Sequence, residues 1–153
     1  MKQNLLSVMT CNIRFDVQEH DPNNHFTKRV YRLTETIEKW QPSILKQDYI
    51  WLSKTPGVID SKDWDSLRVR TLNIARLELI NDDQHANILV FNTHLDVTSE
   101  EARREQANIV RTTIEQWHNK YPKAVVLLFE DFFNSIPKQT SYNTLASGFL
   151  HDT

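Results

Sequence analysis

Apolar and polar residues alternate or recur at helical spacing along the first third of the chain. The alternation over residues 4–12 predicts a first strand. Four apolar residues at helical spacing predict a helix over 27–40: Val30, Leu33, Ile37 and Trp40. Pro42 follows this helix, and residues 43–47 predict a short second strand.

The middle of the chain carries the pattern of a β-hairpin. Residues 53–68 are rich in turn formers, and two strands are expected over 72–81 and 87–95. The polar turn Asn81-Asp82-Asp83-Gln84 joins them.

The last third predicts a helix, a strand and a short helix. Thr98 and Glu101 form a capping box that starts a helix running to about Asn119. Its expected buried stripe is Ala107, Val110, Ile114 and Trp117. The apolar run Lys123–Phe129 is typical of a strand buried on both faces, and a short helix is expected over 139–146. This order of elements indicates one layered, mixed α/β domain.

Composition narrows the function classes. The chain has 153 residues, 39% of them apolar and 25% charged, with a net charge of −2, which fits a folded domain and not a protein that coats nucleic acid by bulk positive charge. Only two glycines are present, which argues against a P-loop or dinucleotide-binding fold. The lone Cys11 excludes an intramolecular disulfide framework, and a cytoplasmic location is expected. No apolar stretch is long enough to span a membrane, and the start of the chain is interpreted as a strand and not as a signal peptide.

Acidic, amide and imidazole side chains gather where strands are expected to end. They are Asn12, Gln47, Asp48, Asn92, His94, Asp96, Asp131 and Asn134. Carboxylate and amide oxygens suit Mg²⁺ or Mn²⁺, which polarise phosphoryl oxygens. Taken singly, each Asn or Asp is more often an ordinary turn former, and His94 alone is more often a packed histidine.

Five segments in order resemble motifs of the endonuclease/exonuclease/phosphatase family. They are Met9–Asp16, Trp40–Leu45 with Gln47-Asp48 after it, Trp51–Gly57 with Ser61–Asp65 after it, Phe91–Asp96, and Glu130–Pro137. The resemblance implies a metal-dependent phosphoesterase on a reduced four-layered α/β/β/α sandwich. The substrate would be a phosphate ester, with nucleic acid, a lipid head group and a sugar phosphate left open.

The resemblance also implies roles for individual residues. Asp48 and Asn12 would hold Mg²⁺ or Mn²⁺, and Asn12 and Asn92 would bind substrate. His94 would contact the scissile phosphate, while Asp131 and Asn134 would orient the attacking water and the phosphate.

Several departures from the family pattern lower the hydrolytic activity that is expected of this chain. Asp48 stands where the family has glutamate, Glu130 replaces a glycine, and an extra Phe separates Asp131 from Asn134. Residues 1–153 are expected to form a single domain with an internal deletion after Asp48 and a truncation after Thr153. Weak or absent hydrolysis follows, and the alternative is a non-catalytic binding protein on the same scaffold. Sheet edges left uncovered predict a homodimer.

Overall fold

The computed structural model describes residues 43–81, 84–130, 140–147 and 150. All of them fall within one compact unit spanning residues 42–153. The predicted strand over 4–12 and the predicted helix over 27–40 lie outside the described residues. So do the candidate site residues Asn12, Asp131 and Asn134.

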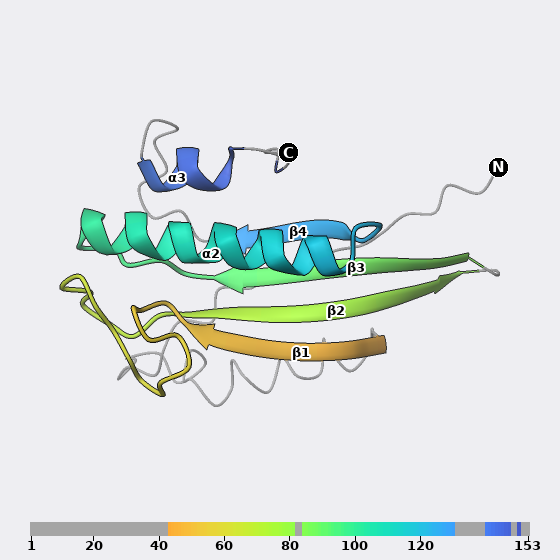
Figure 1. The fold of residues 1–153 in the computed structure, drawn as a ribbon, viewed down its shortest axis with the longest axis horizontal. Coiled ribbons are helices and arrows are strands. Elements are labelled where there is room, and N and C mark those ends of the chain that lie inside the picture. Colours follow the sequence, from red (N-terminus) through yellow and green to blue (C-terminus); the bar gives the residue numbers. More distant parts are fainter. Residues whose placement is uncertain (1–42, 82–83, 131–139, 148–149, 151–153) are drawn as a thin grey trace, which may run out of the picture. The chain divides into compact units, whose positions relative to one another are not determined.

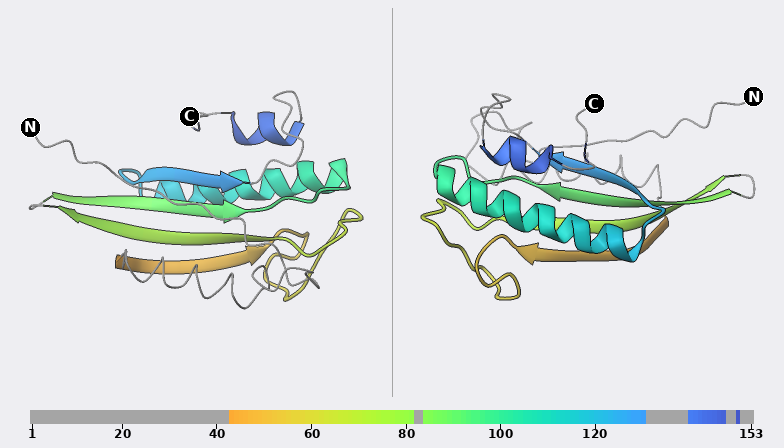
Figure 2. Two further views of the ribbon diagram at one scale, coloured as in Figure 1. Left: turned by 180° about the vertical axis from the view of Figure 1, so that it is seen from behind. Right: turned by 45° about the horizontal axis from the view of Figure 1, so that its top comes forward.

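A four-stranded sheet forms the centre of the described part (Figure 1). Its strands are β1 (Ser43–Trp51), β2 (Thr71–Asn81), β3 (Gln84–Thr93) and β4 (Val125–Glu130), in the order β1-β2-β3-β4. The first two pairings are antiparallel and the last is parallel. The parallel pair requires a crossover, and helix α2 (Glu100–Lys120) supplies it across one face of the sheet (Figure 2). The expected mixed α/β class is therefore confirmed.

The predicted hairpin is confirmed, with longer strands than the sequence pattern indicated. Asn81 pairs with Gln84 and Leu72 pairs with Thr93, so the same register holds along the whole of β2. β3 begins at Gln84, three residues before the predicted start, because backbone pairing continues through polar residues that carry no apolar alternation.

Helix α2 buries the predicted stripe, but it starts from a different cap. Ala107, Val110 and Ile114 are buried, and Trp117 packs against them. Thr98 was expected to cap the helix; instead, Ser99 is the N-cap, with its Oγ accepting a hydrogen bond from Ala102 N at 3.1 Å. The short helix α3 (Thr140–Leu145) confirms the last predicted helix, and Leu145 packs into the same core. No helix in the described ranges is long and apolar enough to cross a membrane.

Two strand predictions were wrong. β1 does not end at Asp48: Tyr49, Ile50 and Trp51 continue it and pair with Asn73, Leu72 and Thr71. β4 is not buried on both faces, because Val125 is 53% exposed and the rest of the strand is half-buried. Within the described sheet β4 pairs on one side only, with β3. An apolar composition alone therefore does not show that a strand lies in the centre of the sheet.

The sheet presents chemically different faces. Toward α2 stand Leu72, Ile74, Leu89 and Phe91, all buried, and Phe91 meets the Trp117 ring edge-on at a centroid distance of 6.5 Å. Because side chains alternate along a strand, the residues between them point to the other face. There Asn73 and Asn92 are exposed directly opposite one another.

The α2 face is the main core of the described unit, and one substitution tests this. Phe91 is fully buried, so Phe91→Ala removes a large apolar contact and leaves a cavity. We expect the free energy of unfolding to fall by about 3–5 kcal/mol in equilibrium urea denaturation. The exposed Gln116 of α2 provides the control, since Gln116→Ala should change stability by less than about 0.5 kcal/mol. Equal losses in the two variants would contradict this assignment of the core.

Candidate functional site

The buried carboxylate of Asp96 ties three separate segments together. Asp96 is only 1% exposed to solvent. Oδ2 accepts hydrogen bonds from Ser66 Oγ at 2.8 Å and from Leu67 N at 2.9 Å, which fixes the loop before β2. Oδ1 accepts from Thr98 N, Thr98 Oγ1 and Ser99 N at 2.8–2.9 Å, which fixes the start of α2.

The surroundings of Asp96 keep it ionised. Burial alone would raise the pKa of this carboxyl group, because it penalises the charged form. The hydrogen bonds from the Ser99 and Thr98 backbone, and from the Ser66 and Thr98 hydroxyls, outweigh burial and hold its pKa well below the ordinary value. The backbone of Asp96 is also engaged, since its N–H donates to the buried side chain of Gln106 at 2.8 Å.

His94 lies between the end of β3 and this anchored carboxylate. Thr93 is the last residue of β3, and its Oγ1 donates to Thr71 O at 2.9 Å. Leu95 N donates to Glu130 Oε1 at the end of β4 at 3.2 Å. The half-buried His94 thus lies between two residues with defined partners, which fixes the segment that carries it.

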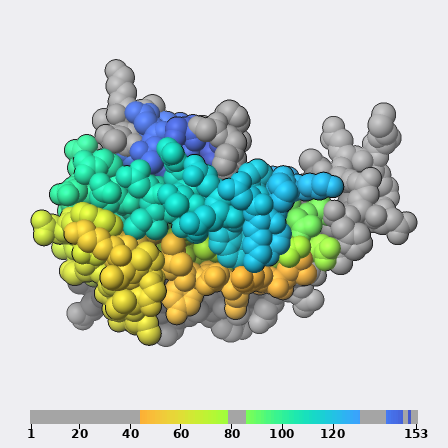
Figure 3. Space-filling view, viewed as in Figure 1, coloured from red at the N-terminus to blue at the C-terminus, as the bar shows by residue number. Residues whose placement is uncertain are grey.

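The loop 52–70 is built by side-chain hydrogen bonds at the same end of the unit as Asp96. It forms a continuous body beside α2 in the space-filling view (Figure 3). Ser53 Oγ and Ser61 Oγ lie 2.6 Å apart, and Lys54 N donates to Asp63 Oδ2 at 2.8 Å. Trp64 adopts a left-handed backbone with φ 57°, and its carbonyl accepts from Ser99 Oγ at 2.9 Å. A bulky residue tolerates this conformation only when its surroundings impose it.

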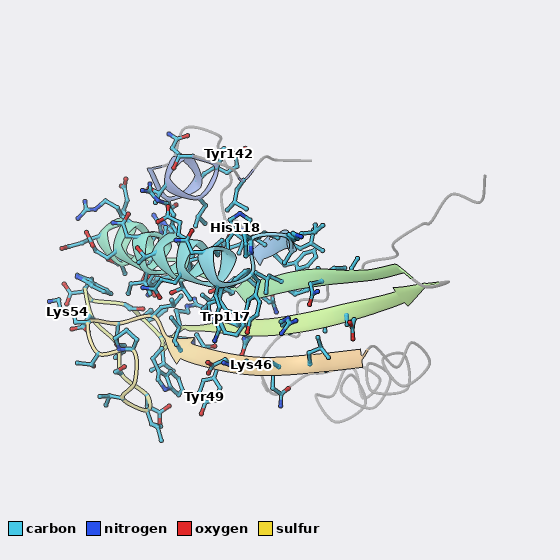
Figure 4. The ribbon with its side chains drawn as sticks, turned by 45° about the vertical axis from the view of Figure 1, so that its right-hand side comes forward. Lys46, Tyr49, Lys54, Trp117, His118 and Tyr142 are labelled. Carbon is cyan, nitrogen blue, oxygen red and sulfur yellow. The ribbon has the colours of Figure 1, made fainter. Side chains whose placement is uncertain are left out.

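A pocket of about 530 Å³ lies on the sheet face away from α2; we call it the strand-face pocket. Two cross-strand rows form it: Tyr49, Asn73 and Asn92 pair across β1, β2 and β3, and Gln47, Ala75 and Val90 make the next row. Asp48 and Ile74 complete the lining. Figure 4 shows Tyr49 on the side of β1 away from Trp117, whereas Lys46 lies toward that ring, 4.9 Å from its centroid.

The predicted site residues that the structure describes do not converge. Asn92 and Asp48 both border the strand-face pocket, but Asp48 pairs with Ile74 in the middle of β1, in the rows that face α2. Asp48 and His94 are separated by about 10 Å along the strands and by two strand spacings of about 4.8 Å across the sheet. The Asp48 carboxylate instead accepts from its neighbour Tyr49 N at 2.9 Å.

The described residues alone do not fit a metal centre. No group of three or more His, Cys, Asp or Glu side chains gathers anywhere in ranges 43–81, 84–130 and 140–147. A hard divalent cation takes several oxygen ligands. The Asp48 carboxylate alone does not provide them. Asp48 as a metal ligand therefore stays a prediction that depends on Asn12, which lies outside the described residues.

Sequence reasoning missed the residues that build these sites. Gln106 is polar and fully buried. The sequence could have indicated this, because Gln106 lies four residues before Val110 and so falls on the buried stripe of α2. Ser66 carried no signal, because its partner Asp96 is thirty residues away. Asn73 had a readable signal, since the hairpin register places it opposite Asn92.

Comparison with known proteins gives similarity at the level of structure. The sequence matches no family model and no curated protein. Two solved structures from Bacteroides thetaiotaomicron share 29% identity over 69% of this chain: an endonuclease/exonuclease/phosphatase family protein, with a TM-score of 0.58, and a mannosyl-6-phosphatase, with a TM-score of 0.59. An endonuclease/exonuclease/phosphatase from Bacteroides vulgatus matches 91% of the chain at 18% identity and a TM-score of 0.67, which shows the fold alone.

These matches cover most of this chain but a smaller share of each similar protein. The chain spans only 36% and 38% of the lengths of the two Bacteroides thetaiotaomicron proteins. It spans 69% of the Bacteroides vulgatus protein. The fold and the resemblance expected from the sequence motifs are thereby confirmed.

The depressed pKa of Asp96 predicts a specific acid sensitivity. Because its pKa is lower in the folded state than in the unfolded chain, it stabilises the fold above the unfolded pKa of about 3.9. That contribution is lost as pH falls through the folded pKa. Asp96→Asn, which presents an amide N–H₂ to at least one existing donor, should lower the free energy of unfolding at pH 7 by about 1.5–3 kcal/mol.

Urea denaturation at pH 7, 5 and 3.5 measures this difference. The gap between wild type and Asp96→Asn should narrow at the lowest pH, where Asp96 of the unfolded chain begins to be protonated while the folded carboxylate stays charged. Asp65→Asn, at an exposed aspartate of the same loop, is the matched control and should track the wild type. A gap that stays constant with pH would contradict the assigned role of the Asp96 charge.

Proposed function

We propose that this chain, which resembles endonuclease/exonuclease/phosphatase proteins in its fold and in the order of its motifs, binds and hydrolyses a phosphate ester at His94. The observation that supports this most directly is the anchoring of the His94 segment. Thr93, Leu95 and Asp96 each have defined partners, so the segment that carries His94 is fixed before any substrate binds. Preorganised donors of this kind stabilise the charge that develops on a phosphoryl oxygen.

The reaction follows from this placement. Water attacks the phosphorus, the bond between phosphorus and the ester oxygen breaks, and the alcohol leaves with a proton. His94 donates a hydrogen bond to a non-bridging phosphoryl oxygen. Asn92, two residues earlier on β3, contacts the substrate, and Asp131 and Asn134 are proposed to orient the water and the phosphate.

Mg²⁺ or Mn²⁺ remains part of the proposal with Asp48 and Asn12 as its ligands. The isolated position of Asp48 in β1 argues for weak binding, because Mg²⁺ depends on close geometry and keeps several waters. Weak hydrolysis is the corresponding expectation. The same observation favours the second candidate function, a non-catalytic binding protein on this scaffold.

An activity assay separates these two functions. We expect slow hydrolysis of bis(4-nitrophenyl) phosphate or 4-nitrophenyl phosphate with Mg²⁺, which EDTA abolishes. His94→Ala should lower the rate by about 100-fold or more, as expected for loss of a donor to the developing charge. Gln116→Ala, on the exposed side of α2, should leave the rate unchanged.

Two outcomes would count against the catalytic proposal. If the wild type shows no turnover above that of His94→Ala, the non-catalytic candidate is favoured. Turnover that survives His94→Ala would move the reaction to another part of the chain.

The partner proposed for the protein itself is a second copy of the chain. β1 pairs with β2 on one side only within the described sheet, and its apolar residues Ile44 and Tyr49 are 54% and 56% exposed. An unpaired edge with apolar side chains favours pairing with another chain, most simply by twofold symmetry.

Light scattering over a dilution series tests the dimer. The wild type should have twice the mass of the chain at high concentration and dissociate on dilution. Ile44→Lys places a charge on the edge strand and should shift the equilibrium to the monomer. A wild-type mass equal to one chain at every concentration would refute the dimer.

A further inference from the structure

The strand-face pocket contains three carboxamides that have no side-chain hydrogen bond to another residue in the described ranges. The side chains of Gln47, Asn73 and Asn92 line it, and all three residues are exposed. Two less exposed amides of the described part are engaged: Gln106 accepts from Asp96 N, and Asn87 accepts from Arg76 Nε. No side-chain hydrogen bond from the three pocket amides to any described residue is present, so their donors and acceptors are available to a ligand.

The register brings these amides together from distant parts of the sequence. Asn73 and Asn92 are directly opposite one another on β2 and β3, and Tyr49 is opposite Asn73 on β1. Side chains in such a row are about 4.5–5.5 Å apart. Gln47 stands in the adjacent row, beside Ala75 and Val90. The result is a set of alternating donors and acceptors beside an aliphatic floor.

The charges of the pocket select against an anionic ligand. Among its described lining residues there is no lysine, arginine or histidine, and Asp48 carries the one formal charge. A phosphate group would therefore meet no cation among these residues. A neutral ligand rich in hydroxyl groups suits the lining better, because a hydroxyl accepts from a carboxamide N–H and donates its one proton to a carboxamide oxygen.

The floor of the pocket also argues against a stacked base. Ala75 and Val90 are aliphatic, whereas bases bind on aromatic ring faces. Tyr49 stands beside them with its ring nearly perpendicular to that of Trp51, at a centroid distance of 6.1 Å. An aliphatic floor matches the C–H face of a sugar ring, and a volume of about 530 Å³ is ample for one or two rings.

We propose that the strand-face pocket binds a neutral hexose-type sugar through the carboxamides of Gln47, Asn73 and Asn92. Asn92 precedes His94 by two residues, about 7 Å along an extended chain. If the proposed function holds, the sugar is the alcohol part of the phosphate ester, and its phosphate extends beyond the pocket toward His94. Sugar binding itself does not depend on hydrolysis.

Binding is tested on the full chain with ligands that carry no phosphoryl group and without added metal. In ¹H–¹⁵N spectra of the labelled protein, methyl α-mannoside and methyl α-glucoside are titrated separately. We expect at least one of them to shift the side-chain amide signals of Gln47, Asn73 and Asn92. Asn73→Ala should weaken that binding by about tenfold, as expected for the loss of one or two hydrogen bonds. Gln116→Ala removes an exposed amide outside the pocket and should leave the dissociation constant unchanged.

The outcomes are distinct from those of the activity assay. The sugar proposal is overturned if neither glycoside shifts these signals, or if adenosine or inorganic phosphate shifts them more strongly. It is also overturned if a glycoside binds equally well to Asn73→Ala. The wild-type spectra locate binding even if that variant fails to fold. A chain that binds a glycoside here but hydrolyses no phosphate ester would support the pocket and refute the catalytic proposal.

Discussion

The buried carboxylate of Asp96 is the interaction on which the rest of the described structure depends. A charged group with 1% exposure is costly unless its lone pairs are satisfied, and five donors from two segments satisfy them here. Removing water from this carboxylate is therefore compensated only when β3, the loop 52–70 and the start of α2 are all in place. The network makes the three segments fold as a unit.

That network helps to fix the segment that carries His94, together with the contacts of Thr93 and Leu95. β3 ends one residue earlier, so a chain without the anchor would leave the imidazole on a free loop. The N-cap follows from the same network, because Asp96 takes the backbone N–H groups of Thr98 and Ser99 before the helix begins. Ser99 is then the first side chain available to cap Ala102. One carboxylate thus joins the helix start to the loop 52–70, next to the segment that carries His94.

Sequence patterns predicted the elements whose signals are local. The hairpin, α2 and α3 were predicted because alternation, helical spacing and turn residues lie within each element. The end of β1 and the exposure of β4 were wrong, because both depend on which strands lie alongside, as shown by the pairing of Tyr49 with Asn73. Asp96 was recognised only as part of a motif and as a turn former; its partnership with Ser66 joins residues thirty positions apart and leaves no periodic signal.

The two faces of the sheet explain why Asp48 and Asn92 cannot be treated as one site on sequence grounds. A single residue added to or removed from a strand moves every following side chain to the opposite face. Asp48 stands in the rows with Lys46, which meets Trp117 under α2, whereas Asn92 stands in the row with Asn73 and Tyr49. Asp48 lies in a strand at the edge of the described sheet and is among the residues that line the pocket, but it is not part of the amide row. The carboxamides in the row supply hydrogen-bond donors and acceptors on this face without a charged group, and such a lining favours recognition of hydroxyl groups over phosphate.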